Sequence, residues 1–329
     1  MNSNSIRLLG CALLLCLSVP GADAQNKKRP PAKTAPPPTK AENKPAPNAE
    51  LQKLRAAVQA NPNSAAAHRA LGQALSQSGD ASGAVAEFKA AVNLDPADVE
   101  AQTLLGKALE QSGDLNGALA AYRHAAELKP DEAALHLALA AILTRQQSPD
   151  SAAAELRYAA KLKPDAAEIH SNLAFVLGQL GDLPGSIAEF EAAVKLKPDL
   201  ADAHYYLGTG KSLLGDWKGA AAALRAAVKL KPQWPEALTS LGIALRETGE
   251  LNDAVAALRE AVKLAPRVLE SRHNLGLALL QARRYDEASN EFQEVLKLNA
   301  NYEGARLNIG IAQLRKGDTA AALATLQKL

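Results

Sequence analysis

The sequence predicts an all-α protein built as a solenoid, in which antiparallel pairs of helices stack one after another. Between regularly spaced prolines, apolar residues follow helical spacing in two successive stretches. The composition, 47% hydrophobic and 22% charged, suits a folded core and excludes a wholly disordered chain. The prolines return every 34 residues, at Pro62, Pro96, Pro130, Pro164, Pro198, Pro232 and Pro266. This period indicates a repeat architecture rather than the two domains that a length of 329 residues suggests.

Residues 1–24 are expected to form a secretory signal peptide. Arg7 precedes a mostly apolar stretch from Leu8 to Val19, and a Pro-Gly break then leads to Ala22-Asp23-Ala24. The apolar stretch reaches about 18 Å as a helix, short of the roughly 30 Å of a bilayer core, so no membrane span should remain after cleavage at Ala24. The mature protein is therefore expected to be secreted or periplasmic.

Both cysteines, Cys11 and Cys16, lie inside this apolar stretch. Cleavage after residue 24 would therefore leave a mature chain without disulfide or thiolate chemistry. The alternative is a lipoprotein, because Leu8-Leu9-Gly10-Cys11 resembles a lipobox. Almost no apolar segment precedes Cys11, which makes the lipoprotein the less favoured interpretation.

The next segment, residues 25–47, is predicted to be a disordered linker rich in Pro, Lys and Ala. Residues 25–49 contain seven prolines and six basic residues against Glu42 alone, a net charge of +5. Such a segment cannot bury a core and should extend as a tether. A basic arm that touches acidic polymers or lipid headgroups is the alternative function.

The repeat array follows, preceded by half a repeat. Residues 48–62 are expected to form an N-terminal capping helix with Leu51, Leu54 and Val58 on one face. Each full unit should be a helical hairpin whose core is completed by its neighbours. The units are 65–98, 99–132, 133–166, 167–200, 201–234, 235–268, 269–302 and 303–329.

Glycine and proline are expected to separate the helices. A glycine such as Gly79 or Gly249 suits the left-handed residue after the first helix, and the closing proline ends the second helix. Asp165 with Glu168, and Asp199 with Asp202, are predicted to cap the next first helix. Three units depart from the pattern, at Gln147-Ser148-Pro149, at Lys211, and at Arg283-Arg284-Tyr285-Asp286.

Small residues predict close packing within each hairpin. The eighth position of a unit holds glycine or alanine, as in Gly72 and Gly276, and is expected to face a small residue such as Ala84 or Ala288 on the second helix. Large residues such as Phe88 should fill the space around this contact.

Two patterns suggest chemistry but are better explained by packing. Gly208-Thr209-Gly210-Lys211-Ser212 resembles the end of a phosphate-binding loop, yet Tyr205 replaces the required first glycine and the segment is predicted to be helical. Histidines recur at the fourth position of four units, too far apart to share a zinc ion. These are His68, His136, His170 and His204. We therefore expect no catalytic residue, no cofactor and no metal.

The 34-residue hairpin with Leu-Gly, then Ala, then an aromatic residue or Leu, then Ala and Pro resembles the tetratricopeptide repeat, over residues 65–329. The resemblance implies a right-handed superhelix whose first helices line a concave groove that binds a peptide or helical segment. Carried over position by position, the groove residues of units four to eight are expected to become more apolar along the chain. They are Ser171, Asn172, Phe175, Gln179, Tyr205, Tyr206, Thr209, Ser212, Thr239, Ile243, Arg246, His273, Asn274, Leu277, Leu280, Leu307, Asn308 and Ile311.

The sequence thus favours a non-catalytic scaffold that binds a protein or peptide partner, with a role in cell-envelope assembly or secretion expected from the signal peptide and the resemblance. The alternatives are a wall or membrane tether that uses the basic tail, a self-associating assembly subunit, and an enzyme at Lys211. The formal net charge of +2 gives no overall field that would attract nucleic acid.

Overall fold

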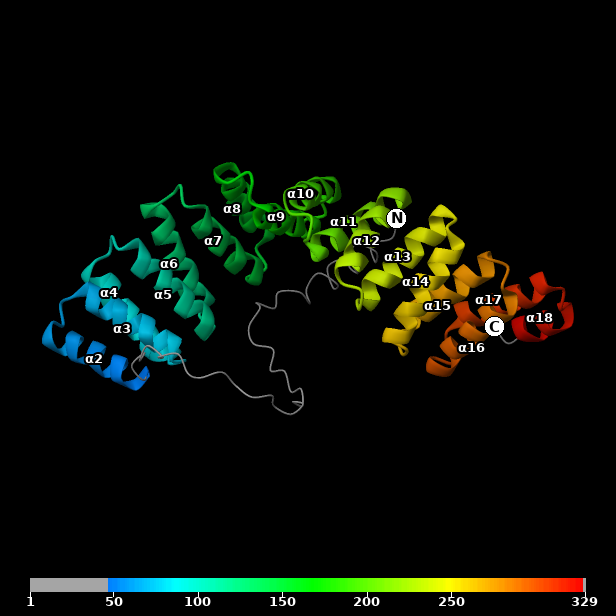
Figure 1. Ribbon diagram of the computed structural model, residues 1–329, viewed down its shortest axis with the longest axis horizontal. Helices are drawn as coiled ribbons and strands as arrows, with labels where there is room; N and C mark the ends of the chain where they lie inside the picture. The colour runs from blue at the N-terminus through cyan, green and yellow to red at the C-terminus, as the bar shows by residue number, and fades with distance from the viewer. Residues whose placement is uncertain (1–46, 328–329) are drawn as a thin grey trace, which may run out of the picture. The chain divides into compact units, whose positions relative to one another are not determined.

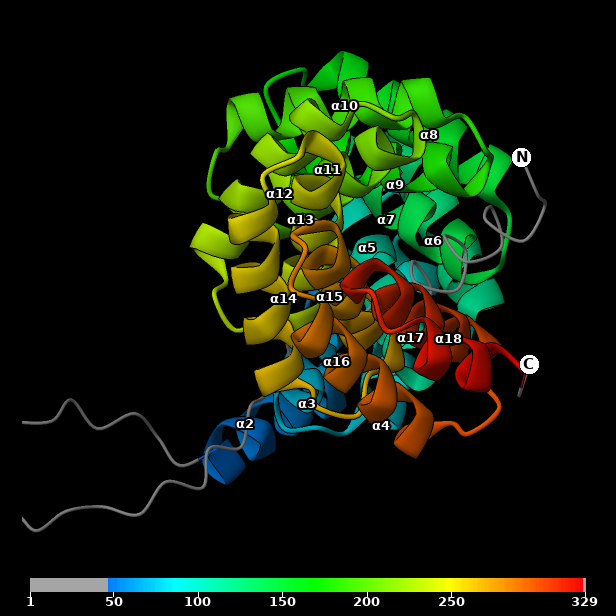
Figure 2. The same ribbon diagram turned by 90° about the vertical axis from the view of Figure 1, so that its right-hand side faces the viewer.

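The computed structural model describes residues 47–327. The predicted signal peptide, both cysteines and the predicted linker up to residue 46 lie outside the described residues. Within the described part all regular structure is α-helical, and consecutive helices lie alongside each other as pairs (Figures 1 and 2). The helices group into two compact units, each of which contains several of the 34-residue repeats and which are called the first unit and the second unit. The unbroken 34-residue spacing of the sequence does not indicate this division.

The first unit contains the half repeat and the first three hairpins. Its core joins Leu71, Phe88, Leu105 and Tyr122 from successive helices, and Leu51 of the half repeat packs against it. The helices are α2 (Pro47–Ala60), α3 (Ala65–Gln77), α4 (Ala81–Leu94), α5 (Val99–Ser112), α6 (Leu115–Leu128), α7 (Ala133–Arg145) and α8 (Pro149–Leu162).

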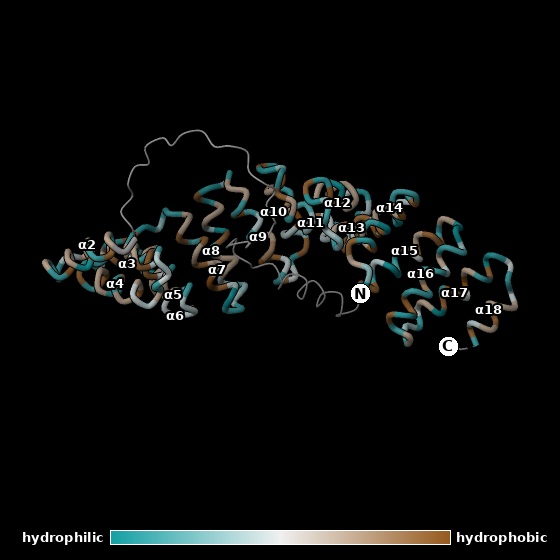
Figure 3. Tube along the Cα trace, turned by 60° about the horizontal axis from the view of Figure 1, so that its bottom comes forward, coloured by the Kyte–Doolittle hydropathy of each residue, from teal (hydrophilic) through white to brown (hydrophobic). Residues whose placement is uncertain are grey.

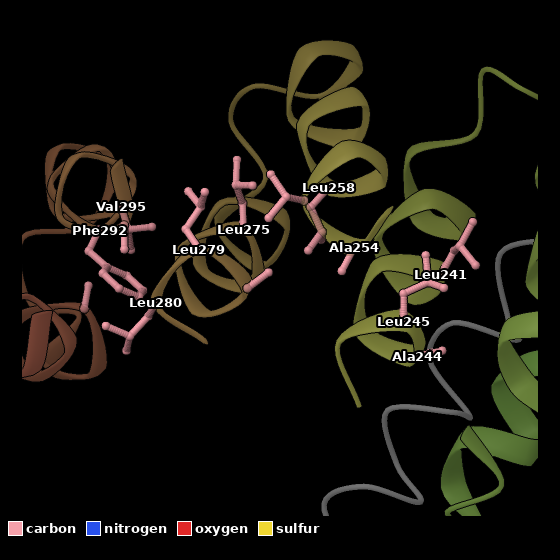
Figure 4. Packing of buried hydrophobic residues seen from close by; sticks show 14 of the residues in the cluster. Leu241, Ala244, Leu245, Ala254, Leu258, Leu275, Leu279, Leu280, Phe292 and Val295 are labelled. Carbon is pink, nitrogen blue, oxygen red and sulfur yellow. The ribbon is translucent and has the colours of Figure 1, made fainter. Parts of the chain in front are cut away.

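The second unit contains the remaining five hairpins. Its largest core cluster runs through Leu224, Leu245, Leu258, Leu275 and Phe292, so each hairpin buries its apolar face against the next (Figure 4). The helices are α9 (Ala167–Gln179), α10 (Leu183–Leu196), α11 (Ala201–Leu213), α12 (Trp217–Leu230), α13 (Pro235–Thr248), α14 (Leu251–Leu264), α15 (Leu269–Gln281), α16 (Tyr285–Leu298), α17 (Glu303–Lys316) and α18 (Thr319–Leu326).

The helix pairs are therefore an α-solenoid of stacked hairpins. Apolar stretches lie within the helices and the connections between them are hydrophilic, as Figure 3 shows. Of the helices in residues 47–327, none combines the length and the apolar character needed to cross a bilayer.

The glycine at the eighth position of a repeat leaves room for the large side chain at the twenty-fourth position of the same repeat. A Cβ added to Gly72 would lie 2.7 Å from Phe88 Cε1, and one added to Gly276 would lie 2.6 Å from Phe292 Cε1. The structure thus refines the expected contact: the ring lies directly over the glycine, while the predicted small partner in this repeat, Ala84, is fully buried. The missing side chain lets the ring approach the backbone of the first helix.

The capping prediction for the first helices is wrong at Asp165 and Asp199. Helix α9 begins at Ala167 and the N-cap residue of α11 is Leu200, one position after the predicted aspartate, with no side-chain cap bond. An aspartate caps a second helix instead: Asp216 Oδ1 accepts from the backbone N–H of Gly219 at 2.9 Å. This aspartate directly follows the left-handed glycine, where its carboxylate faces the first free N–H groups of the second helix.

The left-handed turn between paired helices is retained where glycine is absent. Gln147 has φ 57° and Arg283 has φ 61°, the two non-glycine residues with positive φ in the described chain. Six glycines adopt the same conformation at the equivalent position of the other units, for example Gly249 with φ 85°. Neighbouring packing therefore imposes this turn on residues whose Cβ disfavours it.

We expect Gln147→Gly and Arg283→Gly each to stabilise the protein by about 0.5–1 kcal/mol, because relief of the Cβ clash exceeds the added entropy of the unfolded chain. Thermal unfolding monitored by circular dichroism would measure the gain. The matched control, Gly249→Ala, should destabilise. A loss of stability in both glycine variants would contradict the explanation.

Candidate partner-binding surface

The predicted groove residues lie on the first helices α9, α11, α13, α15 and α17. All of them belong to the second unit except Gln179, which ends α9 and groups with the first unit. They do not form one uniform surface. Three of them, Phe175, Tyr205 and Tyr206, meet in a cluster of aromatic rings. Others are buried, or use their polar groups within the protein.

The aromatic cluster consists of Phe175, Phe190, Tyr205, Tyr206 and Trp234. The Tyr206 ring lies 5.7 Å from that of Phe190, stacked, and 6.2 Å from that of Phe175, edge to face. The Tyr205 ring lies 5.2 Å from Tyr206 and 4.5 Å from Trp234. Phe190 is buried and the other four are half-buried, so the rings form a continuous, partly accessible apolar platform across α9, α11 and the turn before α13.

Charged groups border this platform. Lys231 Nζ lies 5.0 Å from the centre of the Trp234 ring and bonds both carboxylate oxygens of Asp202 at 2.9 Å. Burial raises the pKa of Tyr205 above its ordinary value, and the nearby carboxylates of Glu236 and Glu270 act in the same direction. The phenol therefore stays neutral and can donate a hydrogen bond at physiological pH.

Aliphatic side chains occupy one position of the first helices that follow the aromatic cluster in the chain. The ninth position of the 34-residue repeat holds a half-buried aliphatic residue on three first helices: Ile243 on α13, Leu277 on α15 and Ile311 on α17. Leu307, one turn before Ile311, is 44% exposed. The ninth position is polar on α3, α5 and α11, where it holds Gln73, Lys107 and Thr209, and it is Ala141 on α7. Large aliphatic side chains at this position therefore lie on α13, α15 and α17.

Two predicted groove residues do not belong to the accessible surface, which corrects the sequence-based assignment. Thr239 is 5% exposed, and its hydroxyl pairs with the Ser271 hydroxyl at 2.8 Å on the adjacent first helix. Leu280 is 9% exposed and packs into the core cluster. The adjacent first helix α15 contacts α13 directly and covers Thr239, whereas Leu280 is covered by the core of the second unit.

In other predicted groove residues, the polar groups form hydrogen bonds within the protein. The hydroxyls of Thr209 and Ser212 donate to backbone carbonyls of their own helix. Arg246 bonds Glu247 at 2.7 Å and the side-chain oxygen of Asn274 at 3.3 Å. Ser171, Asn172 and Asn308 remain at least partly exposed.

His273 is a predicted groove residue whose ring is partly buried among other aromatic rings. Its Nδ1 is buried without a hydrogen-bond partner, and its ring lies 5.2 Å from Tyr302 and 5.5 Å from Phe292. Burial lowers the pKa of His273, and the positive charge of Arg246 lowers it further.

Because His273 binds a proton less readily when folded, the unfolded state takes up its proton first as pH falls through the ordinary histidine range, about 6.5. The stability that the neutral His273 ring provides is therefore fully present above about pH 6.5 and is lost as the pH falls below that value. We expect the variant His273→Phe to lose less stability than the wild type between pH 7.5 and 5.5, as measured by urea unfolding. An equal loss in both proteins would contradict this assignment.

The segment that resembles a phosphate loop is helical. Residues 208–212 lie inside α11, where backbone N–H groups serve the helix and cannot encircle a phosphate. Lys211 bonds Glu191 on α10 at 2.8 Å, and its side chain is 21% exposed. Leucine occupies the equivalent position in Leu245 and Leu279, which are 2% and 1% exposed. Lys211 thus stands at a core position and extends its ammonium group to the surface.

Lys211→Leu is accordingly expected to stabilise the protein by about 0.5–1.5 kcal/mol, since it restores apolar burial and gives up an ion pair with an exposed carboxylate. Lys218→Leu, at an exposed position on α12, is the control and should change little. Thermal unfolding would compare the two variants. Destabilisation by Lys211→Leu would indicate that the lysine has another role.

The histidines at the fourth position do not gather into a metal site. Within residues 47–327 no group of three or more His, Cys, Asp or Glu side chains is placed to hold a metal ion. Each of the four instead has hydrogen-bond partners within the protein.

Sequence reasoning missed Trp234 and Phe190 as members of the aromatic cluster. Both lie outside the first helices, Trp234 in the turn before α13 and Phe190 on α10. Trp234 carried a usable signal: it is one of two tryptophans in the chain, and it directly precedes an extra proline, Pro235.

Family profiles described as tetratricopeptide repeat match residues 103–167, 214–267 and 273–329, and a second such profile matches residues 47–108. A TPR repeat profile also matches residues 176–209. The chain belongs to the tetratricopeptide repeat family. These matches agree with the stacked hairpins and with the repeat period of the sequence. A search of curated proteins gives no match.

Solved structures with this fold include YrrB, described as a TPR protein with an unusual peptide-binding site. It is 22% identical, covers 57% of this chain and 97% of its own, and superimposes with a TM-score of 0.55. MamA from Desulfovibrio magneticus RS-1 is 25% identical, covers 52% of this chain and 96% of its own, and has a TM-score of 0.48. The YrrB comparison supports the α-solenoid fold of this tetratricopeptide repeat protein.

Proposed function

We propose that this tetratricopeptide repeat protein is a non-catalytic scaffold whose second unit docks an apolar segment of a protein partner across α9, α11, α13, α15 and α17. The aromatic cluster carries the proposal. Five of the twelve aromatic residues of the chain join in one chain of ring contacts, and four of the five remain partly accessible. Tyrosine and tryptophan dominate binding hot spots because they combine a large apolar area with a polar group.

Further support comes from the aliphatic side chains at the ninth position of α13, α15 and α17, which add apolar surface on the first helices that follow the aromatic cluster in the chain. A hairpin needs Leu275 or Leu279 for its own core, but Leu307 is 44% exposed and adds little to that core. Apolar surface rimmed by polar residues is typical of protein interaction sites. The peptide-binding description of YrrB is consistent with a segment as the ligand.

The proposed setting is the cell envelope, in assembly or secretion. It rests on the predicted signal peptide at residues 1–24, which would carry the protein out of the cytoplasm. The rival proposal, a wall or membrane tether, assigns the main affinity to the basic residues 25–49. Deleting residues 25–46 separates the two: the scaffold keeps its partner, whereas the tether loses envelope association at moderate salt.

The test is site-specific photocrosslinking of the full chain in its native compartment. A crosslinking residue at Asn172, Ile243 or Leu307 samples the proposed surface, and one at Ala222 or Ala256 samples exposed positions on second helices. The proposal expects one protein to be captured from the first three positions and not from the last two. Capture of a second copy of this chain would indicate self-association, and equal capture from both sets would overturn the proposal.

A further inference from the structure

The aromatic cluster favours one kind of occupant. The Tyr205 ring lies 5.2 Å from that of Tyr206 and 4.5 Å from that of Trp234, and all three residues are half-buried. Aromatic surfaces that remain partly accessible are the surfaces on which proline-rich segments dock in proline-recognition domains. A proline-rich segment also loses little conformational freedom when it binds, because the pyrrolidine ring already restricts the backbone. The cluster therefore fits a segment that is rich in proline.

The charge beside the rings is negative. Glu236 on α13 and Glu270 on α15 are exposed, and both act electrostatically on the Tyr205 hydroxyl, which places them close to the cluster. No ion pair between described residues of the second unit includes either carboxylate. The ammonium group of Lys231, which lies over one of the rings, is offset by its two bonds to Asp202. An occupant with positive charge would complement this border.

One segment of this chain has both properties. Residues 25–46, which lie outside the described residues, contain six prolines, among them Pro30-Pro31 and Pro36-Pro37-Pro38. They hold six Lys and Arg residues against Glu42 alone, a net charge of +5. They contain no Leu, Ile, Val or aromatic residue, so the proline rings are their largest apolar groups. The segment thus complements the cluster in charge and in the kind of apolar group that it offers.

A second copy of the chain is the source to which the arrangement points. The segment precedes α2 in the first unit, whereas the cluster lies on α9, α10, α11 and the turn before α13 in the second unit. A second copy brings its segment to the cluster without any demand on the placement of the two units within one chain. Each copy then offers one segment and one cluster, so the contact is head-to-tail rather than symmetric.

We infer that residues 25–46 of one copy dock on the aromatic cluster of another, and that this contact covers the surface until the protein partner displaces it. Proline rings pack on Tyr205 and Trp234, and basic side chains face Glu236 and Glu270. The inference rests on the proposed function, because the segment and the partner compete for one surface. Self-association and partner binding therefore weaken each other to the same degree.

The chemistry of the contact is tested with a synthetic peptide of residues 25–46 and a chain that begins at residue 47, which keeps every described helix. In the variant Trp217→Phe, Trp234 is the remaining tryptophan, and its fluorescence reports on the cluster. We expect a saturable change. A peptide with alanine in place of every proline should bind at least about tenfold more weakly, because the unbound peptide gains freedom. Failure of the natural peptide to saturate the signal below about 1 mM would overturn the inference.

Substitutions in the protein separate the rings from the charges. Tyr205→Leu should weaken peptide binding about 30-fold, the effect of a hot-spot residue. Glu236→Gln/Glu270→Gln should weaken it about three- to tenfold, because exposed ion pairs contribute modestly. The control Glu127→Gln/Asp131→Asn removes two exposed carboxylates from the first unit and should leave peptide binding unchanged. Equal weakening by both pairs would indicate non-specific attraction to negative charge, contrary to the inference.

Sedimentation velocity identifies the source of the segment. At concentrations above the Kd of the peptide, the chain with residues 25–46 should self-associate, and both deletion of the segment and Tyr205→Leu should leave monomers. An equimolar mixture of these two variants should form a complex with one copy of each, because one retains the segment and the other the cluster. A wild-type chain that stays monomeric while the peptide binds would show that the segment docks within its own chain. Association that survives the deletion would also overturn the inference.

Failure of this inference is distinguishable from failure of the proposed function. Crosslinking from Ile243 and Leu307 that captures a protein other than this chain, without binding of the peptide, would overturn the inference alone. Peptide binding at the cluster without a captured partner would support the inference and overturn the proposed function. Where both hold, the captured partner should displace the peptide from the cluster.

Discussion

Replacement of Phe292 by alanine is expected to lower the free energy of unfolding by about 3–5 kcal/mol, the largest effect of any single side chain in the second unit. Phe292 is fully buried, and its ring lies over Gly276 on the paired helix. Its neighbours include Leu279 and Val295 in the same core cluster (Figure 4). Alanine would leave a cavity between the paired helices α15 and α16.

Hydrogen exchange should locate this loss. Helices α15 and α16 contact α14, α13 and α17, so protection should fall in α15, α16 and these neighbouring helices, while α3–α6 keep theirs. Leu298→Ala is the matched control, because Leu298 lies on the same helix but is 43% exposed. A uniform loss of protection over both units would show that the array unfolds as one cooperative body, contrary to nearest-neighbour stability.

Loss of the aromatic platform should weaken partner binding about 30-fold or more, equivalent to the 2 kcal/mol that defines a hot-spot residue. The variant that tests this is Trp234→Ala, because Trp234 is half-buried, precedes α13 and contacts Tyr205 at 4.5 Å. Tyr205→Leu provides a second variant that keeps apolar volume in the core and removes the ring. Affinity for the partner captured by crosslinking is the measurement.

The control for this prediction is Tyr158→Ala. Tyr158 is 42% exposed but lies on the second helix α8 in the first unit. Its removal should leave affinity unchanged within about twofold, because contacts away from a hot spot contribute little. If Tyr158→Ala weakens binding as much as Trp234→Ala, the partner binds elsewhere and the aromatic cluster serves packing alone.

Much of the fold could be predicted because its signals are local. A proline every 34 residues ends each second helix, and Gly79, Gly249 and their equivalents occupy the left-handed turns. The first helices begin where the expected units begin, for example at Ala65 and Val99, whereas the caps predicted at Asp165 and Asp199 are wrong. Asp199 and Leu200 are adjacent in the sequence, and helix boundaries read from a sequence carry an uncertainty of a residue or two, which is the size of this error.

The candidate surface was less predictable, because exposure depends on the neighbouring unit. Thr239 and Ile243 stand on the same helix at expected groove positions, yet Ser271 on α15 covers Thr239 and leaves Ile243 partly accessible. The pairing of Tyr205 with Trp234 joins residues 29 positions apart, at opposite ends of one repeat. No periodic signal within a helix reports such a contact.

The amino-acid sequence was sufficient to predict the helical hairpin and its 34-residue period, because backbone hydrogen bonding and apolar periodicity act over a few residues. The tertiary structure alone decided which first-helix side chains remain accessible, how five aromatic rings from different elements meet, and where the array divides into two compact units. Those features depend on the orientation of packed helices. Side-chain volume and contact at each interface set that orientation.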